Sequence, residues 1–273
     1  MCVECLKERY AHALPLEKYK IIWGNRNMAC CNCKTALVTG ADRGFGLYIA
    51  KGLAKAGYRV YAGRVLKDYQ LLDDLAAAGE NIVPVWLDVS DEKNIEEVRD
   101  RIAKETGRLD ILVSNAAHMG GPNPSEVGGT QPIDFEMLEK DFCINSMAGM
   151  VLTDRMLPLL EKGEDKRLFY TSSEISSLRL MTRVGSMRYA QTKTALNLGV
   201  RMLFNELRPK GYTFRLYQPG GMKQQLPDGT LRKTTSSVDP MDSAAEALHQ
   251  LLTDRIDEDR LALIDYHGRE LSF

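Results

Sequence analysis

Tyr189 and Lys193 are the two side chains whose types and spacing most directly suggest proton chemistry. They stand four residues apart in YAQTK, inside a segment with helical spacing. Residues four apart on a helix share one face, with Cβ atoms about 5–6 Å apart, so the Lys193 ammonium can lie beside the Tyr189 phenol. A neighbouring cation is expected to lower the phenol pKa from its ordinary value of about 10. The pair predicts a tyrosine that gives or takes a proton, with ordinary helix surface as the alternative.

Gly40, Gly44 and Gly46 stand in TGADRGFG, between an apolar run and an amphipathic run. Gly40 would end a strand and allow a tight turn. Gly44 and Gly46 would start a helix without Cβ atoms in front of its amides. Such amides bind phosphate, so this order of strand, turn and helix indicates a dinucleotide site, although the glycine spacing departs from the usual fingerprint. A plain strand-to-helix turn is the alternative.

Apolar, β-branched runs alternate along the chain with stretches of helical spacing. The runs are TALVT, YRVYA, IVPVWL, LDILVS, RLFYTS and YTFRLY, and the helical stretches include LYIAKGLAKAG, DEKNIEEVRDRIAKETG and TALNLGVRMLFNELRPKG. This alternation predicts an α/β fold with a doubly wound parallel sheet of the Rossmann type. We expect one domain over residues 34–273, after an N-terminal extension over residues 1–33. The Gly- and Pro-rich stretch from His118 and the long stretch from Pro219 to Pro240 are expected to be substrate loops.

The sequence resembles the classical short-chain dehydrogenase/reductase family from about Lys34 to the C-terminus. TGADRGFG resembles the family element TGxxxGxG. Further elements follow in order: LDV with Asp88, SNAA, Asn145, Ser173, YAQTK and PGG. Two departures concern loops near the cofactor, where Ala117 replaces a glycine and Gln224 replaces a threonine.

The resemblance implies the site residues. The implied catalytic residues are Asn145, Ser173, Tyr189 and Lys193. The implied cofactor-binding residues are Gly40, Asp42, Arg43, Gly44, Phe45, Gly46, Arg64, Asp88, Val89, Asn115, Tyr189, Lys193, Pro219, Gly220 and Met222. Ser173 would hydrogen-bond the substrate oxygen, and Asn145 would hold a water linked to the lysine.

Ser176 is an alternative candidate for the role of Ser173. Ser173 directly follows the strand run RLFYTS, but Ser176 matches the separation from Tyr189 that many family members show. We favour Ser173, because strand register fixes where a residue emerges while the following loop can lengthen freely.

The end of the second strand run bears on the identity of the cofactor. An acidic residue there would bind a ribose 2′-hydroxyl and repel a 2′-phosphate, but this chain has Arg64. Arg43 occupies a position that is basic in NADP-dependent members and would complete a phosphate clamp. NADP(H) is therefore favoured, and NAD(H) is the alternative.

Composition and net charge indicate which kinds of molecule the protein is expected to bind. The chain has 273 residues, 44% of them hydrophobic, and a formal net charge of −1. Nucleic acids and anionic membranes usually attract a basic surplus, so neither is expected as a partner. We expect a small-molecule substrate, a cytoplasmic location with reduced cysteines, and a homodimer or homotetramer.

The leader contains two CxxC pairs. Cys2, Cys5, Cys30 and Cys33 have the arrangement of a four-thiolate zinc site. The favoured alternative is an extension that packs on the domain through Leu16, Ile22 and Trp23, with incidental thiols and no metal. A natural start at Met28 is a third reading.

Together these features predict an oxidoreductase that transfers a hydride between a nicotinamide dinucleotide and a carbonyl or secondary alcohol. A dinucleotide-sensing regulatory protein without turnover is the alternative. The expected substrate is bulky and apolar, such as a steroid, because the loops expected to surround it carry Met119, Leu178, Leu180, Met181, Met222 and Leu226. Subunit packing is the other explanation for these side chains.

Overall fold

A single eight-stranded sheet organises the protein. The structure, a computed structural model, describes residues 34–119, 134–232 and 237–273. The strand order is β3-β2-β1-β4-β5-β6-β7-β8. The strands are β1 (Thr35–Val38), β2 (Arg59–Arg64), β3 (Ile82–Trp86), β4 (Ile111–Ser114), β5 (Arg167–Thr171), β6 (Thr213–Gln218), β7 (Leu263–Asp265) and β8 (Glu270–Leu271). The first seven pair in parallel and β8 is antiparallel, which confirms the predicted doubly wound parallel sheet.

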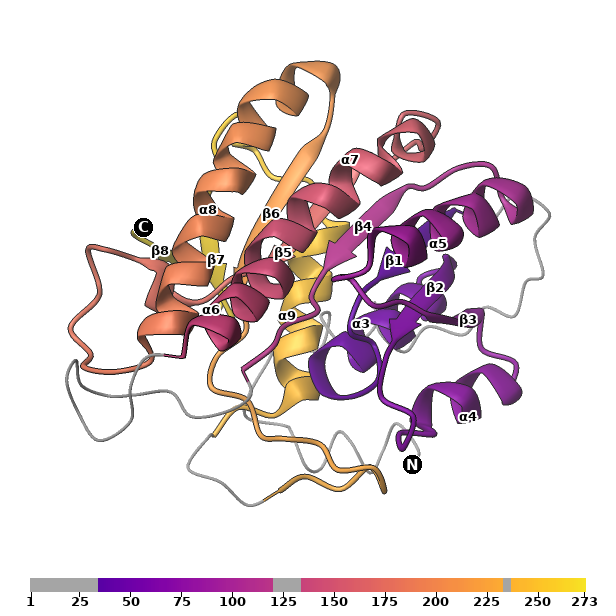
Figure 1. The fold of residues 1–273 in the computed structure, drawn as a ribbon. Coiled ribbons are helices and arrows are strands. Elements are labelled where there is room, and N and C mark those ends of the chain that lie inside the picture. The colour runs from indigo at the N-terminus through magenta and orange to yellow at the C-terminus, as the bar shows by residue number, and fades with distance from the viewer. Residues whose placement is uncertain (1–33, 120–133, 233–236) are drawn as a thin grey trace.

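Helices connect the strands and cover both faces of the sheet (Figure 1). They are α3 (Gly44–Lys55), α4 (Leu71–Ala77), α5 (Glu92–Glu105), α6 (Phe135–Phe142), α7 (Ala148–Leu160), α8 (Met187–Leu207) and α9 (Pro240–Leu252). A π-helical turn, η1 (Cys143–Met147), joins α6 to α7, and the short 3₁₀ turns are η2 (Glu174–Ser176) and η3 (Arg208–Lys210).

The helices form two apolar cores with the sheet, one on each of its faces. Buried side chains of α5, α7 and α8 form one cluster with the sheet, and those of α3, α4 and α9 form the other. α3 and α9 pack closely, because a Cβ at Gly52 would lie 2.0 Å from a Leu248 methyl carbon. Both sheet faces are therefore buried, which explains the continuous apolar strands.

The chain reverses its winding direction beside β1. β1 pairs with β2 on one side and with β4 on the other, so the connections after β1 and β4 leave in opposite directions. In open α/β sheets this switch point, at the carboxyl ends of the strands, is where ligands bind. The glycine turn follows β1 directly.

The last elements were not among those predicted. β7 has three residues and β8 two, too short for a periodic pattern, and α9 follows the stretch interpreted as aperiodic. The local signal for α9 is Asp239, whose carboxylate accepts the Met241 amide, followed by Pro240 in the first turn. The leader cysteines and most of the loop after His118 lie outside the described residues.

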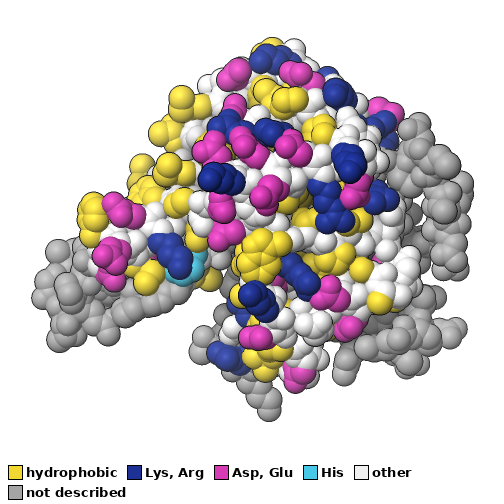
Figure 2. Space-filling view, turned by 45° about the vertical axis from the view of Figure 1, so that its right-hand side comes forward, with side chains coloured by type: hydrophobic (Ala, Val, Ile, Leu, Met, Phe, Trp, Pro, Cys, Tyr) yellow, Lys and Arg dark blue, Asp and Glu magenta, His cyan; other side chains and the backbone are white. Residues whose placement is uncertain are grey.

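Figure 2 shows one face of the molecule, on which Lys and Arg side chains are set among Asp and Glu side chains. Neither sign dominates that face. Among the residues that the structure describes, no helix has the length and apolar character needed to cross a membrane.

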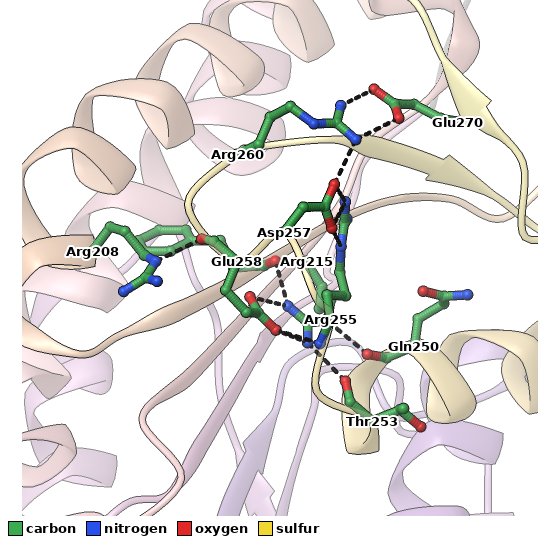
Figure 3. Close-up of polar contacts among 10 residues, drawn as sticks. Arg208, Arg215, Gln250, Thr253, Arg255, Asp257, Glu258, Arg260 and Glu270 are labelled. Carbon is green, nitrogen blue, oxygen red and sulfur yellow. Dashed lines mark hydrogen bonds and ion pairs between the residues drawn. The ribbon is translucent and has the colours of Figure 1, made fainter.

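A buried arginine of β6, Arg215, binds the end of α9 and the segment that follows it (Figure 3). Arg215 is 2% exposed, and its guanidinium donates to the carbonyls of Gln250 and Thr253 at 2.6 and 2.8 Å. It also donates to both carboxylate oxygens of Glu258, at 2.5 and 2.9 Å. Burial, the largest influence, raises the pKa of Glu258, but the hydrogen bonds from Arg215 and the Arg255 amide outweigh it and the net pKa is lowered.

Arg215→Met should therefore lower the free energy of unfolding by about 3–5 kcal/mol, because Glu258 would keep a buried charge without its partner. Urea denaturation measures this loss. Arg155→Met, which breaks ion pairs of an exposed side chain with Glu92 and Asp154, should have a much smaller effect, because exposed ion pairs contribute little to stability. Because the folded-state pKa of Glu258 is lowered, the contribution of the pair is full above the unfolded value of 4.5 and fades as the pH falls below it. Equal stability of the two variants at neutral pH would contradict this.

Candidate active site

The glycine turn joins β1 to α3 at the carboxyl edge of the sheet. Gly40 and Gly44 have φ angles of +62° and +55°, in the left-handed region that glycine adopts without a Cβ clash. A Cβ at Gly46 would lie 2.1 Å from the Gly40 carbonyl oxygen, so the turn closes only with glycine there. The first amides of α3 therefore lie at the switch point of the sheet.

Asn115 fixes this turn from β4. Its Nδ2 donates to the carbonyls of Thr39 and Gly40, each at 3.0 Å, and its Oδ1 accepts from the Thr171 hydroxyl at 3.2 Å. One side chain thus joins the carboxyl ends of β1, β4 and β5. The predicted cofactor residue Asn115 lies where it was expected and has a structural role there.

Two predicted carboxylates are engaged with the backbone. Asp42 is 4% exposed, and its Oδ1 accepts the amides of Val65 and Leu66 at 2.9 and 2.7 Å. Asp88 accepts the amide and hydroxyl of Ser90 at 2.9 and 2.6 Å, in the turn before α5. Both carboxylates therefore shape the loops at the carboxyl edge.

Arg43 directly follows Asp42 in the chain, and Arg64 directly precedes Val65. The hydrogen bond between the Val65 amide and Asp42 therefore brings the backbones at the two arginines together. The Arg43 guanidinium donates to the Tyr69 hydroxyl at 2.8 Å and lies 5.2 Å from the centre of that ring. Arg64 forms an ion pair with Asp73 at the start of α4. The two predicted phosphate contacts thus belong to one corner of the site.

Gln225 is a residue of this site that sequence reasoning missed. It is 4% exposed, and its Oε1 accepts the Gly44 amide at 2.7 Å, while its backbone carbonyl accepts from Arg43 at 3.4 Å and from Tyr69 at 3.2 Å. The segment after β6 is therefore attached to the glycine turn. No local pattern marks this contact, because 181 positions separate Gly44 and Gln225.

The other predicted cofactor residues pack in the apolar cores or make contacts through their backbone. Phe45 and Val89 belong to the two apolar cores. Gly220 has a φ of +82°, the Pro219 carbonyl accepts a hydroxyl from α9, and Met222 forms a bridge with Val238. These residues lie along the loops that leave β1, β3 and β6.

Tyr189 and Lys193 lie in the first two turns of α8. The Lys193 ammonium is 2% exposed, donates to the Thr171 carbonyl at 2.8 Å, and lies 5.8 Å from the centre of the Tyr189 ring. Burial lowers the pKa of Lys193 to about 8 and raises the pKa of Tyr189 to about 12. The phenol pKa therefore lies above its ordinary value rather than below it, because burial disfavours the charged phenolate.

Ser173 and Ser176 have different surroundings. Ser173 is half-buried at the end of β5, and its hydroxyl accepts the Ile175 amide at 3.3 Å. Ser176 is 3% exposed; its hydroxyl donates to the Ser173 carbonyl at 2.5 Å and accepts from Asn197 at 2.7 Å. Ser176 is thus enclosed in a structural network, which favours Ser173 for contact with a ligand.

Asn145 lies in the π-helical turn η1, where the helix is locally widened. Its Oδ1 accepts the His118 amide at 2.7 Å, and its Nδ2 donates to the His118 carbonyl at 2.8 Å. Its Nδ2 also contacts the Thr192 hydroxyl at 3.4 Å. Asn145 is therefore held between the loop after β4 and α8.

Comparison with known proteins defines the class of protein. The profile of the short chain dehydrogenase family matches residues 34–233, and the chain belongs to that family. An uncharacterized oxidoreductase of Myxococcus xanthus is 32% identical over 205 residues, which cover 73% of this chain and 76% of that protein. The C-signal of Myxococcus xanthus is 28% identical over 168 residues, covering 61% of this chain and 93% of its own length.

Solved structures share the fold. The NADPH-bound carbonyl reductase from chicken fatty liver has a TM-score of 0.75 at 22% identity, with 89% of this chain and all of that chain covered. The carbonyl reductase Sniffer of D. melanogaster has a TM-score of 0.77 at 20% identity, with 88% and 100% covered.

The chain is therefore an NAD(P)-dependent oxidoreductase of the short-chain dehydrogenase family. The site fits a dinucleotide, because α3 begins at the switch point of the sheet, and the N-terminus of a helix favours a phosphate. Arg43 precedes Gly44 at the start of α3, and Arg64 is the last residue of β2.

Proposed function

We propose that the protein reduces a carbonyl compound with NADPH, with Tyr189 as the proton donor. The observation that carries this proposal is the buried ammonium of Lys193 beside the Tyr189 ring, at the carboxyl edge that also holds the glycine turn. Asn145 lies in η1 and Ser173 directly precedes η2, and both turns pack against α8, which supports their inclusion in the proposed site.

The ionisation of the two groups suits reduction. A phenol with its pKa raised to about 12 keeps its proton at neutral pH and can give it to a developing alkoxide. Lys193, with a pKa of about 8, is largely cationic at neutral pH and stabilises the phenolate that remains. Ser173 would donate a hydrogen bond to the same substrate oxygen. Bound NADPH supplies the hydride.

The cofactor contacts follow from the same geometry. The pyrophosphate would meet the amides of Phe45 and Gly46, since the Gly44 amide donates to Gln225. A 2′-phosphate would be held by Arg43 and Arg64, each of which has a guanidinium suited to paired phosphate contacts. NAD(H) is the alternative, in which Arg64 keeps its ion pair with Asp73.

The substrate is proposed to be bulky and apolar, such as a ketosteroid. Large apolar side chains stand exposed around the predicted substrate loops: Met119 at 68%, Leu178 at 85%, Leu180 at 45% and Val184 at 82%. Exposed apolar surface next to a polar reacting site is the usual lining for such a ligand. A dinucleotide sensor without turnover remains the second candidate function.

A homodimer or homotetramer in the cytoplasm is part of the proposal. Leu198 and Met202, one turn apart on α8, are each 65% exposed and would lie against a second copy. The catalytic domain is proposed to span residues 34–273, with residues 1–33 as an extension.

Tyr189→Phe should reduce turnover by about 10²–10⁴-fold, because the ring packs equally well but has no proton to donate. A panel of ketones and aldehydes with NADPH and NADH first identifies a substrate for the wild-type protein, and steady-state kinetics then compares the variant. Fluorescence titration should give an unchanged affinity for NADPH. Wild-type turnover in the variant would show that another group is the acid, and dinucleotide binding without any turnover by the wild type would favour the sensor.

Arg64→Asp should lower kcat/KM with NADPH about ten- to hundredfold more than with NADH, because an attractive contact to the 2′-phosphate becomes repulsive. Asp73→Asn is the matched control, since it breaks the same ion pair but keeps Arg64. The control should retain the preference for NADPH. The same NADPH-to-NADH ratio in both variants and the wild type would mean that Arg64 does not contact the cofactor.

A further inference from the structure

A buried carboxylate of α6 contacts both the loop after β4 and the start of α8, the helix that carries Tyr189 and Lys193. Asp141, near the end of α6, is 1% exposed. Its Oδ1 lies 2.7 Å from Nδ1 of His118, in the loop after β4, and its Oδ2 lies 3.4 Å from Nη1 of Arg188, in the first turn of α8. The family resemblance assigns no role to any of these three side chains.

His118 connects this carboxylate to Asn145. Its backbone amide and carbonyl hold the two ends of the Asn145 amide group, at 2.7 and 2.8 Å. Its ring is bonded to Asp141, which precedes Asn145 by one turn on the same helical segment. An ionised carboxylate only accepts hydrogen bonds, so Nδ1 carries the proton and the ring orientation is fixed. The hydrogen bond of the ring to Asp141 thus anchors the same residue whose backbone holds Asn145.

Arg188 connects the same carboxylate to Tyr189. α8 begins at Met187, after Ser186 in the left-handed conformation with a φ of +55°, and Tyr189 lies in its first turn. First turns of helices fray unless side chains hold them. Arg188 is 2% exposed and pairs with Asp141, and Thr192, one turn further on, contacts Asn145. Two contacts thus fix the start of α8 against α6 and η1.

We propose that Asp141 and His118 are positioning residues of the reaction: Asp141 holds the His118 ring and Arg188, and through them it sets Asn145 and Tyr189 in their working positions. The inference rests on the proposed function, because it assumes that these two residues act in turnover. It assigns no contact between Asp141 and substrate or cofactor.

His118→Leu and His118→Asn are the discriminating pair. Leucine removes the hydrogen bond to Asp141, whereas the Asn side-chain amide can donate from about the position of Nδ1. We expect His118→Leu to lower kcat at least tenfold with less than a threefold change in substrate KM and in the affinity for NADPH. His118→Asn should keep kcat within threefold of wild type. Hydrogen exchange at the amides of Cys143–Met147 should rise in the leucine variant alone.

Asp141→Asn and Asp110→Asn form the second pair. Asp110 is a fully buried carboxylate bound to Arg108 at the opposite end of the strands. Both variants should melt earlier, but only Asp141→Asn should lose kcat in the folded protein. If His118→Leu turned over and exchanged like wild type, or if both Asp variants kept wild-type kcat, the positioning role would be wrong. Failure of the proposed function is recognised separately, by a wild-type protein without turnover or an active Tyr189→Phe variant.

Discussion

The buried ammonium of Lys193 sets the geometry on which the rest of the site depends. An ammonium in the interior is costly unless it is bonded, and here the Thr171 carbonyl at the end of β5 accepts from it at 2.8 Å. That bond draws α8 onto the carboxyl end of β5, and Tyr189 follows because it lies one turn earlier on the same helix. Thr171 also bonds to Asn115, which in turn holds the glycine turn. A short chain of hydrogen bonds thus connects Lys193, the neighbour of the proposed acid, to the glycine turn.

The switch point of the sheet explains why residues so distant in sequence meet there. Parallel strands deliver the loops after β1, β4, β5 and β6 to one edge. Gly40 and Gly46 allow the closest approach, and Gln225 fastens the last of these loops to the Gly44 amide. The loop after β6 is therefore attached to the glycine turn through Gln225.

The fold was predictable because β1, β2, β4, β5 and β6 are almost entirely buried and their sequences are largely apolar. β7 was not, since three residues carry no period, and α9 shows only its Asp-Pro start. Residue types and a familiar order of motifs indicated Tyr189, Lys193 and Asn145. Gln225 and the contact of Asp141 with His118 depend on tertiary approach and leave no local pattern. The direction of the Tyr189 pKa shift was also wrong from sequence alone, because spacing gives the neighbouring cation but not the burial of the phenol.

The central claim is that this edge of the sheet transfers hydride from NADPH to a carbonyl carbon while the chain supplies the proton. Transfer of deuterium from NADPH that carries deuterium in place of both hydrogens on the reactive nicotinamide carbon tests it most directly, with mass spectrometry of the alcohol product. The account predicts one deuterium on the carbinol carbon for each molecule of cofactor oxidised. An alcohol product without the label, or tight NADPH binding with no oxidation across the carbonyl panel, would contradict it.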